Sequence, residues 1–171
     1  MRYLALYLGT SFLKGAVLNL EDATIDHVTR TPFPAAVGGL PARYVEVDPS
    51  AIVLATQTLL DQLAALAPDA VGVVVTSQMH GIVLSDPRGK ALSNAVTWQD
   101  QRILDDAGVG IGSYYDRLLA ELDPEAIAAT GNGLKPSLPL CTLEWWAAKN
   151  QLPEGAVPAS LPDYVFATIA R

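Results

Sequence analysis

The chain has 171 residues, half of them hydrophobic and 17% charged, and its eleven Lys and Arg against eighteen Asp and Glu give a formal net charge of −7. This composition predicts one folded domain rather than a disordered chain, and the acidity without a basic cluster argues against a nucleic-acid partner. Cys141, the single cysteine, excludes an internal disulfide framework. No apolar run is long enough for a membrane span, and the N-terminus lacks the pattern of a secretory signal. We therefore expect a cytoplasmic protein that binds neither nucleic acid nor membranes.

Three short runs rich in apolar or β-branched residues open the chain, at Tyr3 to Gly9, Leu13 to Leu20 and Thr24 to Phe33. Each run is typical of a strand, and the first has the continuous apolar character of a buried central strand. Because the connecting turns are short, the three strands are predicted to form an antiparallel meander.

A helix and a further strand are predicted next. Asp48 or Ser50 can cap the helix, an apolar stripe at helical spacing continues it, and Pro68 ends it. The run from Ala70 to Thr76, AVGVVVT, is β-branched and continuous. It predicts a buried parallel strand that the helix reaches as a crossover connection.

The second half of the chain mixes short strands with helices. The strands are predicted at Ile82 to Ser85 and Ala95 to Trp98, around the turn DPRGK. Helices are predicted from Gln99 onward, from Ser113 to Leu122, after the cap Asp123 with Pro124 at its first position, from Leu138 to Asn150, and from Pro162 to Arg171. This order predicts an α/β fold with a mixed sheet flanked by helices rather than a doubly wound one.

The turn after the first strand, at Gly9, Thr10 and Ser11, is the first candidate site. Glycine allows a phosphate to approach the backbone, the two hydroxyl residues supply donors, and Lys14 can supply a cation. The same sequence is also typical of an ordinary hairpin turn.

The second candidate follows the 70–76 strand and contains Gln78, Met79 and His80. The carboxyl ends of strands in open α/β sheets are common ligand sites. The amide and imidazole can bind sugar hydroxyls, and the thioether offers an adaptable apolar contact. A single histidine after a strand is also often structural.

The third candidate comprises Trp98, Asp100 and Arg102. The indole can stack on a sugar face, the carboxylate can accept hydrogen bonds from a polyol, and the guanidinium can anchor the carboxylate. The alternative is that these residues only open a helix, where an acidic first turn is favourable.

In combination, these motifs resemble the N-terminal domain of the FGGY carbohydrate kinases, and most closely its xylulokinase members. The resemblance extends over nearly the whole chain, in the stretches YLALYLGTSFLKGAVLNL, YVEVDPSAIV, VGVVVTSQMHGIVLSDPRGKALSNAVTWQDQR, TGNGLKPSLPLCTLEWWAAKN and LPDYVFATIAR.

The resemblance implies an actin-like, ribonuclease H-like ATPase domain. In the family a sugar lies in a cleft between two such domains, ATP and Mg²⁺ lie mostly on the second domain, and an aspartate acts as general base in phosphoryl transfer to the sugar. Residues 1–171 would then be the sugar-binding domain, truncated and without the nucleotide-binding domain. No catalytic residue is assigned, because the general base is expected in the missing domain.

Matched position by position, Met79 and His80 correspond to the family's sugar-contacting pair, and Asp100 and Arg102 to polar residues that line the same cleft. The 9–11 turn corresponds to a phosphate-facing turn, and Lys14 to its usual lysine.

Two residues depart from the family. Tyr7 stands where the family has an aspartate next to the metal, and a neutral phenol cannot supply that charge, so no metal ligand is assigned. Thr142 replaces a usual lysine. We expect either the sugar-binding half of a kinase that is inactive alone, or a degenerate module that binds a sugar or a protein. The partner would be a small sugar, with a separate C-terminal kinase domain or a second copy of the chain as possible protein partners.

Overall fold

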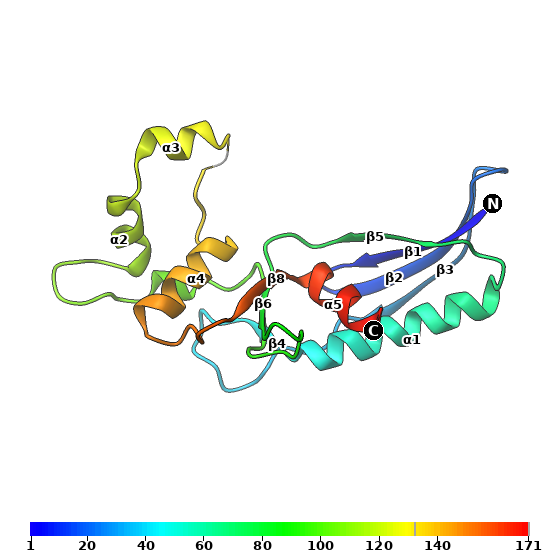
Figure 1. The fold of residues 1–171 in the computed structure, drawn as a ribbon, viewed down its shortest axis with the longest axis horizontal. Coiled ribbons are helices and arrows are strands. Elements are labelled where there is room, and N and C mark those ends of the chain that lie inside the picture. Colours follow the sequence, from blue (N-terminus) through cyan, green and yellow to red (C-terminus); the bar gives the residue numbers. More distant parts are fainter. Residues whose placement is uncertain (132, 171) are drawn as a thin grey trace.

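The computed structural model describes residues 1–131 and 133–170 and contains two four-stranded sheets. The first sheet has the order β3-β2-β1-β5, with bounds Thr24–Pro32, Phe12–Asn19, Arg2–Leu8 and Val73–Ser77. The second has the order β4-β7-β6-β8, with bounds Glu46–Val47, Ala95–Val96, Ile82–Ser85 and Val157–Ser160. Figure 1 shows the first sheet with α1 (Pro49–Leu66) at one end of the molecule and a group of helices at the other.

The predicted meander is confirmed, because β1 pairs antiparallel with β2, and β2 with β3. The predicted crossover is also confirmed: α1 leads to β5, which pairs parallel with β1. The Asp48 carboxylate caps the helix by accepting a hydrogen bond from the Ser50 amide at 2.8 Å. The apolar stripe of α1 buries Ile52, Leu59 and Leu63 in a core shared with the first sheet.

The prediction that the strand around residues 70–76 is buried is wrong. β5 is an edge strand, and Val73 and Val74 are 46% and 50% exposed. A β-branched run favours a strand, but it does not determine how many neighbours the strand has. Within the described residues, β5 pairs only with β1, which leaves its outer edge open.

The second sheet contains two predicted strands, β6 and β7, and two that the sequence did not reveal, β4 and β8. The helix predicted from Gln99 is reduced to one 3₁₀ turn, Arg102–Leu104. The Asp100 carboxylate accepts a hydrogen bond from the Arg102 backbone amide at 3.0 Å at the start of this turn, and the backbone is already extended at Asp105, where the turn ends.

Three helices form the lobe on the left of Figure 1: α2 (Tyr114–Glu121), α3 (Pro124–Ala129) and α4 (Pro139–Ala148). Ser113 and Asp116 form a capping box at the start of α2, and Asp123 caps α3. Trp145 and Trp146 of α4 pack with β6 and β7 residues in a second core.

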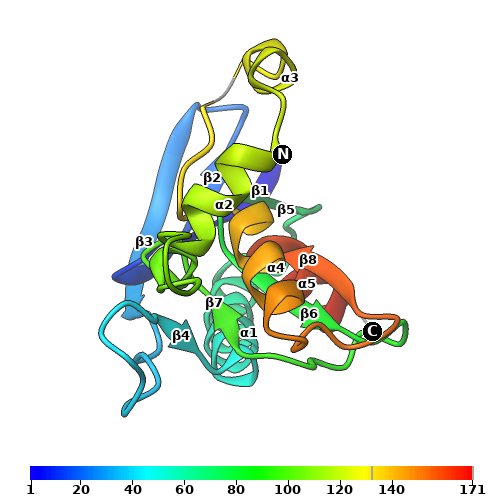
Figure 2. The same cartoon turned by 90° about the vertical axis from the view of Figure 1, so that its left-hand side faces the viewer.

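The last helix, α5 (Leu161–Ile169), begins after the cap Ser160 and returns to the first core, where Leu161 and Val165 are buried. α5 contacts β6 and β8, and Figure 2 shows it beside these two strands. Among the residues that the structure describes, no helix is long and apolar enough to cross a membrane.

Candidate functional site

One hydrogen-bonded chain links the three candidate motifs. The Trp98 indole Nε1 donates to Thr10 Oγ1 at 2.9 Å, and Thr10 Oγ1 lies 3.3 Å from Gln78 Oε1, to which it donates. Thr10 follows β1, Gln78 follows β5, and Trp98 follows β7. The fold therefore brings three segments that are far apart in sequence to the carboxyl ends of the parallel strands β1 and β5.

Backbone contacts fix the turn between β1 and β2 tightly. The Gly9 amide donates to the Phe12 carbonyl at 3.1 Å. A β-carbon on Gly9 would lie 2.7 Å from that carbonyl oxygen and 2.6 Å from Cε1 of Tyr7. Glycine is therefore required by close approach, and Ser11 stays exposed beside it.

Gln78 is the most constrained polar residue of this site. Its side chain is only 9% exposed, and its Nε2 has no hydrogen-bond partner although it is buried. Such an amide carries a desolvation cost until a ligand or water accepts its hydrogens. The site thus holds unused donors at the point where the three motifs meet.

Met79 and His80 directly follow Gln78 and face outward to different degrees. Met79 is 71% exposed, whereas His80 is partly buried. His80 has φ of 69°, a left-handed conformation that is uncommon for a residue other than glycine. Such strain often accompanies functional loops.

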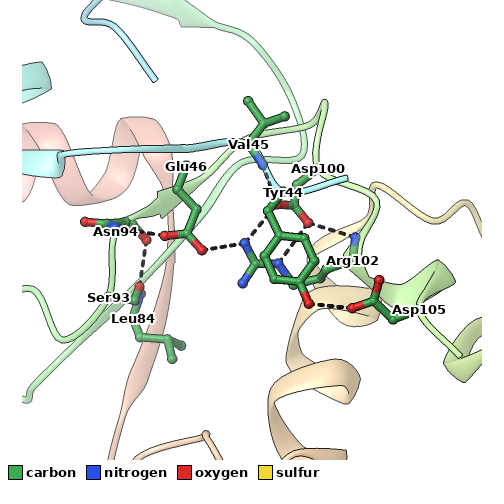
Figure 3. Close-up of polar contacts among 9 residues, drawn as sticks. All are labelled: Tyr44, Val45, Glu46, Leu84, Ser93, Asn94, Asp100, Arg102 and Asp105. Carbon is green, nitrogen blue, oxygen red and sulfur yellow. Dashed lines mark hydrogen bonds and ion pairs between the residues drawn. The ribbon is translucent and has the colours of Figure 1, made fainter. Parts of the chain in front are cut away.

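Asp100 and Arg102 lie apart from this network and hold each other in the interior (Figure 3). Arg102 Nε and Nη2 donate to the two oxygens of Asp100, each at 2.8 Å, and Nη2 also donates to Glu46 at 2.6 Å. The Val45 amide donates to Asp100 at 2.7 Å, and Asn94 donates to Glu46 at 2.8 Å. Arg102 thus anchors Asp100 as the sequence suggested, but both carboxylate oxygens are already occupied.

Three aromatic rings surround the guanidinium of Arg102. Its central carbon lies 4.6 Å from the ring centre of Tyr44, 5.2 Å from that of Trp145 and 5.7 Å from that of Trp146. Burial lowers the pKa of Arg102, but the hydrogen bonds to Asp100 and Glu46 outweigh it, and the net shift is upward. The Tyr44 hydroxyl donates to Asp105, and burial together with this bond raises the pKa of the phenol.

We call this buried group the Arg102 cluster. It contains Asp100 and Arg102, which the sequence analysis selected, and six residues that it missed: Tyr44, Val45, Glu46, Asn94, Trp145 and Trp146. The segments YVEVDP and CTLEWWAAKN were part of the resemblance, but Glu46, Trp145 and Trp146 had no assigned partner. Those segments carried the available signal. The cluster positions the loop that carries Trp98, because Asp100 and Arg102 follow Trp98 directly.

The residues at the 9–11 turn do not fit Mg²⁺. Tyr7 supplies no carboxylate, and its ring lies against Gly9. Residues 1–131 and 133–170 contain no group of three or more His, Cys, Asp or Glu that could hold a metal ion. Mg²⁺ prefers carboxylate and phosphate oxygens in octahedral geometry, which these side chains do not provide.

Comparisons with known proteins identify the family. Residues 2–155 match the model of the FGGY family of carbohydrate kinases, N-terminal domain. A search of curated proteins found no match.

Solved structures match along most of the chain. A xylulose kinase from Rhodospirillum rubrum has a TM-score of 0.79 at 24% identity over 98% of this chain and 34% of its own. A ligand-bound xylulose kinase from Lactobacillus acidophilus has 0.78 at 20% identity over 98% and 33%, and a xyloylose kinase from Brucella ovis has 0.71 at 26% identity over 88% and 30%. The chain therefore spans about a third of these structures. It has their α/β, actin-like fold, and it belongs to the FGGY family of carbohydrate kinases as an N-terminal domain.

Proposed function

We propose that residues 1–171 form the sugar-binding half of a carbohydrate kinase that acts on a ketopentose or a similar polyol. The observation that supports this proposal best is the link from Trp98 through Thr10 to Gln78, with a buried and unsatisfied Nε2 at its end. Buried donors beside a partly exposed indole suit a ligand that has an apolar face and many hydroxyls.

In this proposal each residue of the chain has a separate task. Trp98, 41% exposed, would stack on the carbon face of the sugar, and Gln78 would donate to a hydroxyl. Met79 and His80 would contact the sugar from the next loop. Asp100 and Arg102 would act as positioning residues, because their polar atoms are engaged within the Arg102 cluster.

The phosphoryl donor would be ATP with Mg²⁺, which supplies the transferred group and charge stabilisation when it is bound on a second domain. The general base would also belong to that domain, which would be a further part of the same protein or a separate chain. The proposed setting is cytoplasmic. By itself, the described chain would bind sugar and transfer no phosphate.

Titration of xylulose into the 171-residue chain tests the proposal. With only one wall of a cleft present, we expect millimolar affinity or weaker, about −4 kcal/mol or less. Amide shifts at residues 78–80 and a change in Trp98 fluorescence would report binding, and a Trp98→Phe variant is the control for the fluorescence signal. Micromolar saturation would contradict the half-site, and the absence of any shift at high millimolar sugar would contradict sugar binding.

A coupled kinase assay with ATP, Mg²⁺ and xylulose tests the predicted inactivity. We expect no turnover above a heat-inactivated control, and Tyr7→Asp should not restore it, since the base and the nucleotide pocket are proposed to lie on a second domain. Turnover by the purified chain would overturn this expectation.

A second candidate is a degenerate, non-catalytic module that binds a sugar or a protein, and Tyr7 is the observation that favours it. A self-associating form, in which a second copy covers the exposed surface, belongs to this candidate. Adding the missing domain in trans separates the two: a kinase half should gain activity with Tyr7→Asp by orders of magnitude, whereas a degenerate module should stay inactive.

A further inference from the structure

We propose that Tyr7 closes the 9–11 turn to phosphate and Mg²⁺, so that the site takes neutral hydroxyl ligands and this chain does not hold the phosphoryl donor. The family implies the opposite for this turn, so the inference concerns a property of this chain. The exclusion of phosphate and Mg²⁺ does not rest on the proposed function, whereas the preference for neutral hydroxyl ligands does.

The first support is steric. The Tyr7 ring is 37% exposed and lies so close to the turn that a β-carbon on Gly9 would be 2.6 Å from Cε1 and 3.2 Å from Cδ1. A glycine at such a turn normally lets an anion approach the backbone. Here a neighbouring aromatic ring occupies the space that the missing side chain leaves.

The second support is the use of the polar groups of the turn. The Gly9 amide donates to the Phe12 carbonyl, and the Thr10 hydroxyl accepts from Trp98 and donates to Gln78. An oxyanion that recruits the Gly9 amide or the Thr10 hydroxyl hydrogen would have to break the bond to Phe12 or the bond to Gln78, and each break leaves an acceptor unsatisfied.

The third support is the charge near the ring. The Lys14 ammonium lies 5.5 Å from the centre of the Tyr7 ring, and Lys14 pairs with Tyr7 across β1 and β2. This cation–π contact holds the ring and the ammonium together. A ring that offers no carboxylate, with an ammonium over its face, is an unfavourable neighbour for Mg²⁺, so this support concerns the metal and not the phosphate.

Gln78 indicates what the site accepts instead. Its buried Nε2 offers donors without a formal charge, and it is joined through Thr10 to the partly exposed Trp98. A neutral polyol hydroxyl can accept from this uncharged amide, whereas a hydrated metal–phosphate group would need carboxylate ligands that the Tyr7 ring does not supply.

The test compares wild type, Tyr7→Ala, Tyr7→Asp and the matched control Tyr7→Phe, which keeps the ring. Mg²⁺ with inorganic pyrophosphate is titrated into each ¹⁵N-labelled chain, and the amides of residues 9–11 are followed. We expect no saturable shift in wild type or Tyr7→Phe. Tyr7→Ala and Tyr7→Asp should bind at least about tenfold more tightly, and Tyr7→Asp should require Mg²⁺.

Two outcomes would overturn the inference: saturable shifts at the turn in wild type, or silence in both Tyr7→Ala and Tyr7→Asp. Thermal unfolding of each variant confirms that the chain is folded. If either Tyr7→Ala or Tyr7→Asp fails to fold, the other variant still tests the inference. A xylulose titration of the same samples keeps the two proposals apart. If sugar fails to bind anywhere, the sugar-binding function fails, while the pyrophosphate result still decides the role of Tyr7.

Discussion

The two polar groups near Trp98 are built in opposite ways. In the Arg102 cluster, charged groups are deeply buried and bonded to one another, and aromatic rings enclose the guanidinium. In the network of Thr10, Gln78 and Trp98, the groups are partly exposed and one buried amide nitrogen has no partner. The charged groups of the cluster are satisfied and stabilise one arrangement, although the indole Nε1 of Trp145 is also buried without a partner, whereas the unsatisfied Gln78 amide is joined to a partly exposed ring. The difference separates scaffold from site more clearly than residue type does.

Among the variants that test this difference, replacement of Arg102 should lower the free energy of unfolding most. Arg102→Met leaves the buried Asp100 carboxylate without its partner, and we expect a loss of about 3–5 kcal/mol in the free energy of unfolding. Urea denaturation measures it, with Arg88→Met at an exposed position as the matched control. A loss no larger than that of the control would show that the cluster is not a scaffold.

Gly9→Ala should come next in size. The new methyl group would meet the Phe12 carbonyl at 2.7 Å, and that backbone oxygen cannot move freely. We expect a loss of about 1–3 kcal/mol in stability. The control is Gly38→Ala, where nothing lies within 4 Å of the added carbon and stability should be unchanged or slightly higher. Equal stability losses in Gly9→Ala and Gly38→Ala would contradict the conclusion that close contacts at the turn require glycine at position 9.

Gln78→Met should separate binding from stability. It removes an unsatisfied buried amide and keeps the volume similar, so the free energy of unfolding should change by less than about 1 kcal/mol. Affinity for xylulose should fall by about tenfold or more, because the donor to the sugar is lost. Titration and thermal unfolding of the same sample give both numbers, and Gln62→Met on the exposed side of α1 is the control. Unchanged sugar affinity would remove Gln78 from the site.

Cys141 reports how closed the helical lobe is. The thiol is fully buried in the second core, and burial raises its pKa from 9.0 to about 11. The unfolded thiol loses its proton at lower pH than the folded one, so stability should decrease as pH rises from about 9 to 11. Unfolding midpoints across that range measure the slope, and Cys141→Ala should lessen it. An unchanged slope in Cys141→Ala would show that the thiol is not responsible.

Much of the fold could be predicted where the signal is local. Short turns fixed the meander, and Asp48 with Pro49 marked the start of α1. Pairing between distant segments was not available from the sequence. β8 pairs with β6 across more than seventy residues, and β5 has the composition of an interior strand although it lies at an edge.

The candidate site shows the same limit. Thr10, Gln78 and Trp98 could be selected because each follows a predicted strand, and the structure joins them. The burial of Arg102 could not be foreseen, since its partners Glu46 and Trp145 come from segments on either side of it. Only their tertiary arrangement shows that the guanidinium is anchored by Asp100 and Glu46 while Arg102 also lines a pocket beside Trp145.

The hydrogen bond between Trp98 and Thr10 spans 88 residues, and this separation has a consequence for the order of folding. The β1–β3 meander closes short loops, whereas the pairing of Ser85 with Val157 must enclose the entire helical lobe, and the entropy of closure rises with loop length. We expect the hairpins to form early and the Trp98 contact to form late. Stopped-flow refolding, with the Trp98 signal obtained as the difference between wild type and Trp98→Phe, should show that signal lagging behind the far-ultraviolet circular dichroism. Simultaneous changes would mean that the ligand site and the sheet assemble in one step.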